Sequence, residues 1–401
     1  MNFLAFLVLS AATLSGQNWP LFRGAGNSLT AAQNLPISWS EEENIRWEKE
    51  LSGYGQSSPV VWGDLVVVTC TEGDNKETLV VEGFDLQTGD SRWKYTQPNA
   101  APQEVSNYIS RSAPTPAIDA NQVYAFFESG DVVCLNHQGE RGWKRELQKE
   151  YGEFKGNHGL GSSPTLTEDA LVVLVDHSGP SYLLAMNKTD GGNKWKVDRP
   201  ERVSWSSPVV EGEPGAQRVI LSSNGALQRY DAATGDLLWE TDGFEGNTVP
   251  SATVTEGYVL VGSKDRGQNQ LFKIKADSNE LEPVWKSEDQ TSSFGSPLIY
   301  GEYVYFVSKA GVASCVSLAT GEELWKERLP ASCWASAVGN GNHVYFFSTD
   351  GTTTVIEAGP EYKKLAENSL PTEDKVYGVA LVDGAIVIRT GNKLTCVSSA
   401  K

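Results

Sequence analysis

The chain has 401 residues, and 33 basic against 51 acidic side chains give it a formal net charge of -18. This balance argues against a nucleic-acid surface, because phosphate binding needs clustered Lys and Arg. Hydrophobic residues make up 39% of the chain, and 12 Trp, 14 Tyr and 13 Phe provide material for a large core. Frequent Val, Thr, Ser and Gly beside only 2 Met favour an all-β protein.

The N-terminus has the composition of a secretory signal peptide. An apolar run, Phe3 to Leu9, is followed by small residues that suit a cleavage site, and it is too short to span a bilayer. Gln17 stands where a bacterial lipoprotein would carry its lipidated cysteine. We expect residues 1–16 to be a cleaved signal peptide, residues 17–43 to be an N-terminal extension, and the protein to be secreted or periplasmic without a transmembrane segment. A buried N-terminal strand is the alternative interpretation of the apolar run.

From residue 44 to 398 the chain repeats a unit of four strands. Short apolar runs bounded by turn residues are typical of buried strands. First strands, which often read small residue-Ser-Pro, begin at Ser57, Ser112, Ser162, Ser206, Pro250, Gly295, Ala335 and Gly378. Second strands begin at Leu65, Val123, Leu171, Val219, Val259, Val304, Val344 and Ile386. Both sets number eight.

The third and fourth strands are joined by a recurring turn and tryptophan. The clearest copies run from Asp85 through Gly89 to Trp93, from Asp231 to Trp239, and from Ser317 to Trp325. The glycine permits a positive φ, and an Asx side chain bonds its own turn. We expect each indole to pack on the neighbouring unit with its N–H on a backbone acceptor. The predicted structural docking residues are Trp47, Trp93, Trp143, Trp195, Trp239, Trp285 and Trp325.

The two ends of the repeat region complement each other. The chain ends just after a third strand, Leu394 to Val397, whereas a lone fourth strand occurs at Asn44 to Leu51. Repeats of roughly 40–50 residues indicate propellers or solenoids, and an exchanged terminal strand closes a ring without an open seam. We predict a single domain over residues 44–398, an eight-bladed β-propeller of four-stranded antiparallel blades closed by the N-terminal strand. Seven blades is the alternative, because Leu365 replaces the tryptophan of the last unit.

The repeat resembles that of pyrroloquinoline-quinone (PQQ)-like propellers, whose Ala-x-Asp-x-x-Thr-Gly-x-x-x-Trp motif is matched nearly in full from Tyr230 to Trp239. The opening, Asn18 to Gly24, resembles that of secreted bacterial quinone-like repeat proteins. The resemblance covers about residues 44–398 and includes two groups, the PQQ- and calcium-dependent dehydrogenases and non-catalytic scaffolds such as the outer-membrane assembly lipoprotein BamB. It implies the propeller fold. The paired cysteines, calcium ligands and base of the dehydrogenases match no motif in this chain.

The sequence contains no motif of another kind of catalysis or of metal or phosphate binding. The four histidines show no zinc spacing, and no Gly-x-Ser-x-Gly elbow or phosphate loop is present. The five cysteines are expected to fill the core. We therefore predict no catalytic, cofactor-binding or metal-binding residue.

A binding site is expected at the mouth of the central channel. The residues preceding the first strands should ring it, and Gln56, Arg111, Trp205, Phe294, Trp334 and Tyr377 are our candidates for partner or ligand binding. Two spans, Trp93 to Ser112 and Trp143 to Ser162, are 19 residues long where others are 11, and they add Tyr108 and His158. The alternatives are aromatic rings that only plug the blades and loops that are only solvated spacers.

We interpret the chain as a binding or scaffolding module, a monomer with a protein or extracellular polymer partner and no cofactor. The first alternative is a PQQ- and calcium-dependent dehydrogenase. The second is an enzyme of unknown type that uses the channel mouth.

Overall fold

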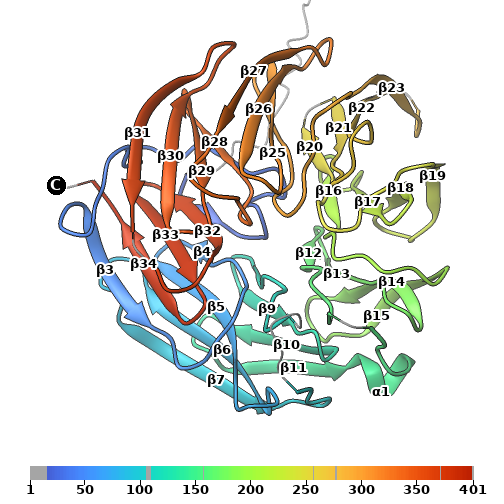
Figure 1. The fold of residues 1–401 in the computed structure, drawn as a ribbon. Helices are drawn as coiled ribbons and strands as arrows, with labels where there is room; N and C mark the ends of the chain where they lie inside the picture. The colour runs from blue at the N-terminus through green and yellow to red at the C-terminus, as the bar shows by residue number, and fades with distance from the viewer. Residues whose placement is uncertain are drawn as a thin grey trace, which may run out of the picture.

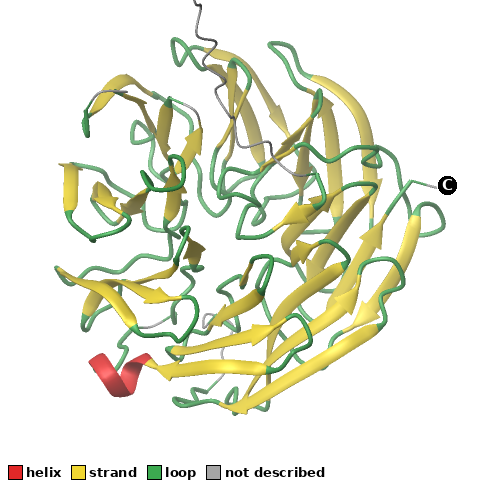
Figure 2. Ribbon diagram, turned by 180° about the vertical axis from the view of Figure 1, so that it is seen from behind, coloured by secondary structure: helices red, strands yellow, loops and turns green. Residues whose placement is uncertain are grey.

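The computed structural model describes residues 16–104, 110–156, 158–255, 257–275, 278–370 and 372–399. Eight sheets, each built on a four-stranded antiparallel blade, surround a central axis (Figure 1). Seen from behind, the described chain is almost all strand and loop, with one short helix at the rim (Figure 2). The prediction of an eight-bladed all-β propeller is confirmed. The expected signal peptide lies outside the described residues apart from Gly16.

The blades are numbered here by the order of their first strands. Blade 1 is β4 (Val60–Trp62), β5 (Leu65–Glu72), β6 (Thr78–Asp85) and β7 (Ser91–Pro98); blade 2 is β8 (Ala117–Ile118), β9 (Gln122–Phe126), β10 (Asp131–Asn136) and β11 (Arg141–Glu146), followed by α1 (Leu147–Tyr151). Blade 3 is β12 (Thr165–Leu166), β13 (Ala170–Val175), β14 (Ser181–Asn187) and β15 (Asn193–Arg199); blade 4 is β16 (Val209–Glu211), β17 (Arg218–Ser223), β18 (Ala226–Asp231) and β19 (Leu237–Asp242).

The second half of the ring repeats this order. Blade 5 is β20 (Thr253–Thr255), β21 (Tyr258–Val261), β22 (Gln270–Ile274) and β23 (Leu281–Lys286); blade 6 is β24 (Leu298–Tyr300), β25 (Tyr303–Val307), β26 (Val312–Ser317) and β27 (Glu323–Arg328). Blade 7 is β28 (Val338–Asn340), β29 (His343–Phe347), β30 (Thr352–Glu357) and β31 (Lys363–Ser369). Blade 8 is β32 (Val376–Val382), β33 (Ala385–Thr390), β34 (Lys393–Val397) and the N-terminal β3 (Ile45–Glu50).

The seven-blade alternative is wrong, and the ring closes as predicted. Blade 7 is complete because β31 keeps a full ladder with β30, although Leu365 replaces the tryptophan and is 39% exposed. In blade 8, β3 pairs antiparallel with β34, with Trp47 opposite Cys396. Figure 1 shows blue β3 beside red β34. The first and last parts of the chain therefore share one sheet and leave no open seam.

Adjacent blades dock through the fourth-strand tryptophans. The Gly89 turn has a φ of +73°, and a Cβ there would lie 2.7 Å from the Trp47 indole of the preceding blade. The glycine thus serves both the turn and the docking surface. Indole N–H groups donate to the next blade from Trp47 to Leu86 O, Trp93 to His137 O, Trp143 to Lys188 O, Trp195 to Ala232 O, Trp285 to Leu318 O and Trp325 to Gly359 O. Trp239 packs edge-on against Phe272 at 5.9 Å.

A belt of hydroxyl groups joins the inner ends of the blades. In each case a backbone N–H donates to a Ser or Thr hydroxyl of the next blade, at 2.8–3.0 Å. The links run from Ser58 to Thr115, Ser163, Ser207, Ser251, Ser296 and Ser336 in turn. At Gly378 the belt has no hydroxyl, because a Cβ there would come within 2.6 Å of Ser58 Cα. The Ser-Pro pattern of the first strands therefore encodes contacts between blades.

The N-terminal extension fills the end of the channel. Strand β1 (Asn18–Trp19) pairs with β4, and β2 (Leu29–Thr30) pairs parallel with β28. Asn18 lies opposite Trp62, the last residue of β4, and Trp19 is only 1% exposed. The extension therefore enters the ring from the end at which the first strands finish.

Arg23 lies inside this plug. Its guanidinium donates to Ser28 Oγ at 3.0 Å and, in blades 5 and 6, to Ala252 O at 3.0 Å, Thr253 Oγ1 at 2.6 Å and Pro297 O at 3.2 Å. The residue is 4% exposed. Burial lowers the pKa of Arg23 to about 9, which still leaves a cation at neutral pH. One side chain thus ties the extension to two blades more than 200 residues away.

Candidate binding site at the channel mouth

The hydroxyl belt defines which residues are equivalent around the mouth. Thr115 is the partner of Ser58, so Ala113 is the equivalent of Gln56 in blade 2. Arg111 lies two residues before that position. By the same register, Tyr377 lies one residue after the position in blade 8 that is equivalent to Gln56. Both side chains nevertheless reach the mouth, from the loops that precede the first strands and opposite to the plugged end.

Four half-buried rings form a continuous series, here called the aromatic arc: Phe294, Trp334, Tyr377 and Tyr54. Phe294 stacks on Trp334 at 4.8 Å between centroids, and Trp334 meets Tyr377 edge-on at 5.5 Å. Tyr377 meets Tyr54 edge-on at 6.4 Å, and their hydroxyls are 2.8 Å apart. The rings come from four successive loops. The sequence predicted three of them as site residues but neither their contact with one another nor the participation of Tyr54.

Charged and polar side chains hold the arc in place. The Arg111 guanidinium lies 4.6 Å from the centre of the Tyr54 ring, and Lys375 Nζ lies 5.1 Å from that of Trp334. The Tyr377 hydroxyl donates to Asp374 Oδ1 at 3.1 Å. Burial, together with the hydrogen bonds to Tyr377 and Asp374, raises the pKa of Tyr54, so the phenol stays neutral at physiological pH. The mouth therefore presents ordered aromatic faces with two cations beside them.

The remaining candidates lie elsewhere on this face. Gln56 exchanges hydrogen bonds with the Arg111 backbone, at 2.9 and 3.0 Å. Trp205 is outside the arc, with its indole N–H on Gly159 O at 2.8 Å and the His158 ring 5.9 Å away. The two long loops are tied together, since the backbone N–H of Ser110 donates to His158 O at 3.0 Å. Tyr108 lies outside the described residues.

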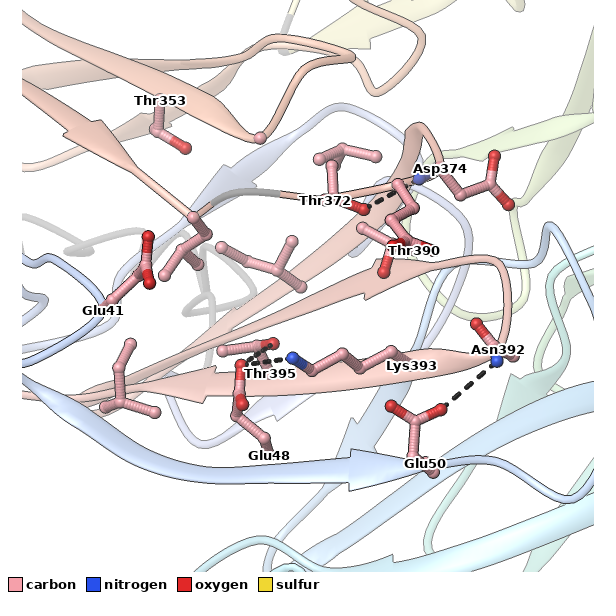
Figure 3. A pocket seen from close by; sticks show the side chains of 16 residues that line it. Glu41, Glu48, Glu50, Thr353, Thr372, Asp374, Thr390, Asn392, Lys393 and Thr395 are labelled. Atoms are coloured by element: carbon pink, nitrogen blue, oxygen red, sulfur yellow. Dashed lines mark hydrogen bonds and ion pairs between the residues drawn. The ribbon is translucent and has the colours of Figure 1, made fainter.

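A groove of about 450 Å³ lies between blades 7 and 8 (Figure 3). Asp374 lines this groove and also accepts the hydrogen bond from Tyr377 of the arc. The lining of the groove is rich in carboxylates and threonines, and some of these carboxylates are paired. Glu48 binds Lys393 at 2.7 Å, and Glu50 accepts from the Asn392 amide at 3.2 Å. In the described ranges no group of three His, Cys, Asp or Glu side chains is arranged to hold a metal ion.

The five cysteines lie in the core of the protein. All five cysteines are buried free thiols, as expected of core residues. Within the part of the chain that the structure describes, no helix has the length and apolarity to cross a membrane.

A closed ring of eight blades docked by Asx-x-x-Thr-Gly-x-x-x-Trp turns defines a PQQ-like β-propeller. The chain belongs to the family described as outer membrane protein assembly factor BamB, whose model matches residues 22–155 and 136–398. The resemblance inferred from the repeats is therefore confirmed.

Two BamB proteins and a dehydrogenase are similar to this chain at low sequence identity. The outer membrane protein assembly factor BamB of Shewanella oneidensis is 22% identical over 319 residues, which cover 77% of this chain and 71% of that protein. The crystal structure of BamB from Moraxella catarrhalis matches with a TM-score of 0.65 at 14% identity, covering 88% of this chain and 97% of that one. A europium-containing methanol dehydrogenase matches with a TM-score of 0.68 at 9% identity, covering 94% and 90%. At such identities the structural matches show the fold alone.

Proposed function

We propose that this protein is a non-catalytic periplasmic binding module that holds a protein partner on the face bearing the channel mouth. Its named relatives are outer membrane protein assembly factors, which supports a role in the assembly of outer-membrane proteins. The observation that carries the proposal is the aromatic arc with Arg111 and Lys375 beside it.

The arc has the physical properties of an interface anchor. Large aromatic side chains and Arg contribute most of the binding energy in protein interfaces. Because the rings are already stacked and hydrogen bonded, little side-chain entropy remains to be lost on binding. Because the N-terminal extension occupies the opposite end of the channel, we place the partner at the mouth. A protein partner is favoured over an extracellular polymer because the named relatives act on proteins.

Enzymatic alternatives have less support. The match to methanol dehydrogenase concerns the fold, and among the described residues no three His, Cys, Asp or Glu side chains are grouped to hold a metal ion. We therefore propose neither PQQ nor calcium at the mouth. Melting with and without PQQ plus calcium tests this point, since a ligand at a hundredfold excess over its Kd stabilises the folded state by about 2.7 kcal/mol. A clear upward shift would favour the dehydrogenase.

The proposal is tested by site-specific photo-crosslinking in the native periplasm. A crosslinking residue replaces Lys375, which is exposed beside Trp334, and in a control it replaces Leu237, which is 50% exposed on the rim strand β19. We expect one reproducible protein adduct from position 375 only. The same adducts from both positions would contradict the proposal.

The contribution of the arc to the binding free energy is then measured with this protein and the identified partner, both purified. The double variant Arg111→Ala, Trp334→Ala should bind the identified partner at least about 30-fold more weakly, the loss expected for one hot-spot residue of about 2 kcal/mol. Leu237→Ala is the matched control and should bind as the wild type does. Wild-type affinity in the double variant, with an unchanged melting temperature, would remove the arc from the interface.

A further inference from the structure

A second cavity, of about 150 Å³, lies beside Trp205, and described residues of both long loops, among them Gln103 and His158, contribute to its lining. Side chains from blades 2 to 4 and their loops line it, including Phe154, His158, His177, Trp205, Glu128 and Asp176. We call it the Trp205 pocket. Neither the binding face proposed above nor the family relationship assigns it a ligand.

The apolar walls are ordered before any ligand binds. The Phe154 and His177 rings are 4.8 Å apart, and those of His158 and Trp205 are 5.9 Å apart. The Trp205 indole is held by its bond to Gly159 O. An apolar cavity of about this volume is known to accept benzene, so the space suits a single six-membered ring.

His177 adds a polar group without a partner. Its Nδ1 accepts the Lys155 backbone N–H at 3.0 Å. Burial lowers the pKa of His177, so the ring is neutral at pH 7 and carries its proton on Nε2. The residue is 4% exposed, and its Nε2 has no hydrogen-bond partner among the described residues.

The two carboxylates of the pocket are already neutralised. Glu128 pairs with the buried Lys76 at 3.2 Å, and Asp176 pairs with the buried Arg199 at 3.0 Å. A cationic ligand would therefore find no free counter-charge in these two groups. Glu128 Oε2 receives the Ser112 backbone N–H at 3.0 Å and keeps capacity for one more donor.

We propose that the Trp205 pocket receives the phenol ring of a tyrosine side chain from the protein partner, an inference that rests on the proposed function. The ring occupies the aromatic walls. The hydroxyl group accepts a hydrogen bond from a donor such as His177 Nε2–H and donates one to an acceptor such as Glu128 Oε2. A phenylalanine ring fits the same space but leaves these polar groups unpaired, so the pocket selects the phenol.

Small side-chain analogues test the pocket without the partner. p-Cresol and toluene are titrated against the full chain, with binding measured by saturation-transfer NMR. We expect p-cresol to bind at least about tenfold more tightly than toluene. His177→Phe should abolish this preference, Trp205→Ala should weaken both ligands, and the rim variant Leu237→Ala should change neither. Melting curves confirm that each variant is folded.

The outcomes separate this inference from the proposed function. Equal binding of p-cresol and toluene to the wild type, or p-cresol binding that survives Trp205→Ala, overturns the phenol pocket while leaving the arc untouched. If p-cresol binds as expected and displaces the crosslinked partner, the tyrosine assignment is supported. If p-cresol binds but does not compete with the crosslinked partner, the occupant is a free phenolic compound and the tyrosine assignment is wrong. If p-cresol binds as expected but no partner crosslinks, the proposed function fails while the phenol pocket stands.

Discussion

Arg23 is the side chain whose removal should most directly show that the N-terminal extension is part of the fold. In Arg23→Ala, Ala252 O loses its charged donor, whereas Pro297 O keeps the Thr253 hydroxyl. An unsatisfied buried acceptor costs about 1–3 kcal/mol. The two deleted methylene groups add about 1.6 kcal/mol. Relief of the buried charge offsets part of this loss, and we expect a net destabilisation of about 3 kcal/mol.

This destabilisation corresponds to a measurable change in melting temperature. An unfolding entropy of about 2.1 cal/mol/K per residue over a folded part of roughly 380 residues converts about 3 kcal/mol into roughly 4 °C. Differential scanning calorimetry of the purified variants measures it. Arg23→Met keeps the apolar stem but not the donors, so it should lose about half as much and separate hydrogen bonding from packing.

Arg266→Ala is the control. Its side chain is 79% exposed and lies 3.7 Å from Asp289, an exposed pair whose removal should cost no more than about 0.5 kcal/mol. If Arg23→Ala melts within about 1 °C of Arg266→Ala, the four hydrogen bonds of Arg23 do not secure the extension and the reasoning fails.

Two further predictions concern the belt and the Trp205 pocket. Gly378→Ser would restore the repeat pattern, yet we expect it to lower the melting temperature, because its Cβ would clash with the Ser58 backbone; a rise would refute this packing. Because burial lowers the pKa of His177, the folded protein binds that proton less readily than the unfolded chain does. The neutral His177 ring therefore makes its full contribution to the free energy of unfolding above the unfolded pKa of about 6.5. This contribution is lost as the pH falls from that value towards and through the lower folded pKa. Urea unfolding at two pH values should show a larger acid loss for the wild type than for His177→Asn, and equal losses would contradict this assignment.

The candidate site was only partly predictable. Phe294, Trp334 and Tyr377 were named from their positions before the first strands, and they form three members of the arc. Tyr54 was missed because it precedes the first strand of blade 1, outside the positions compared between repeats. It meets Tyr377 only because ring closure places blade 1 beside blade 8.

The sequence by itself determined the blade and the closure and favoured eight blades, whereas the seven-blade alternative was excluded only by the complete β30–β31 ladder of blade 7. These features depend on short-range chemistry repeated along the chain: a glycine turn, a docking tryptophan and alternating buried strands, with one strand displaced to the other end. Tertiary structure alone decided the plug, the arc and the Trp205 pocket. Arg23 contacts residues 229 and 274 positions away, and such contacts have no periodic signal, because each occurs once and depends on how the closed ring brings distant loops together.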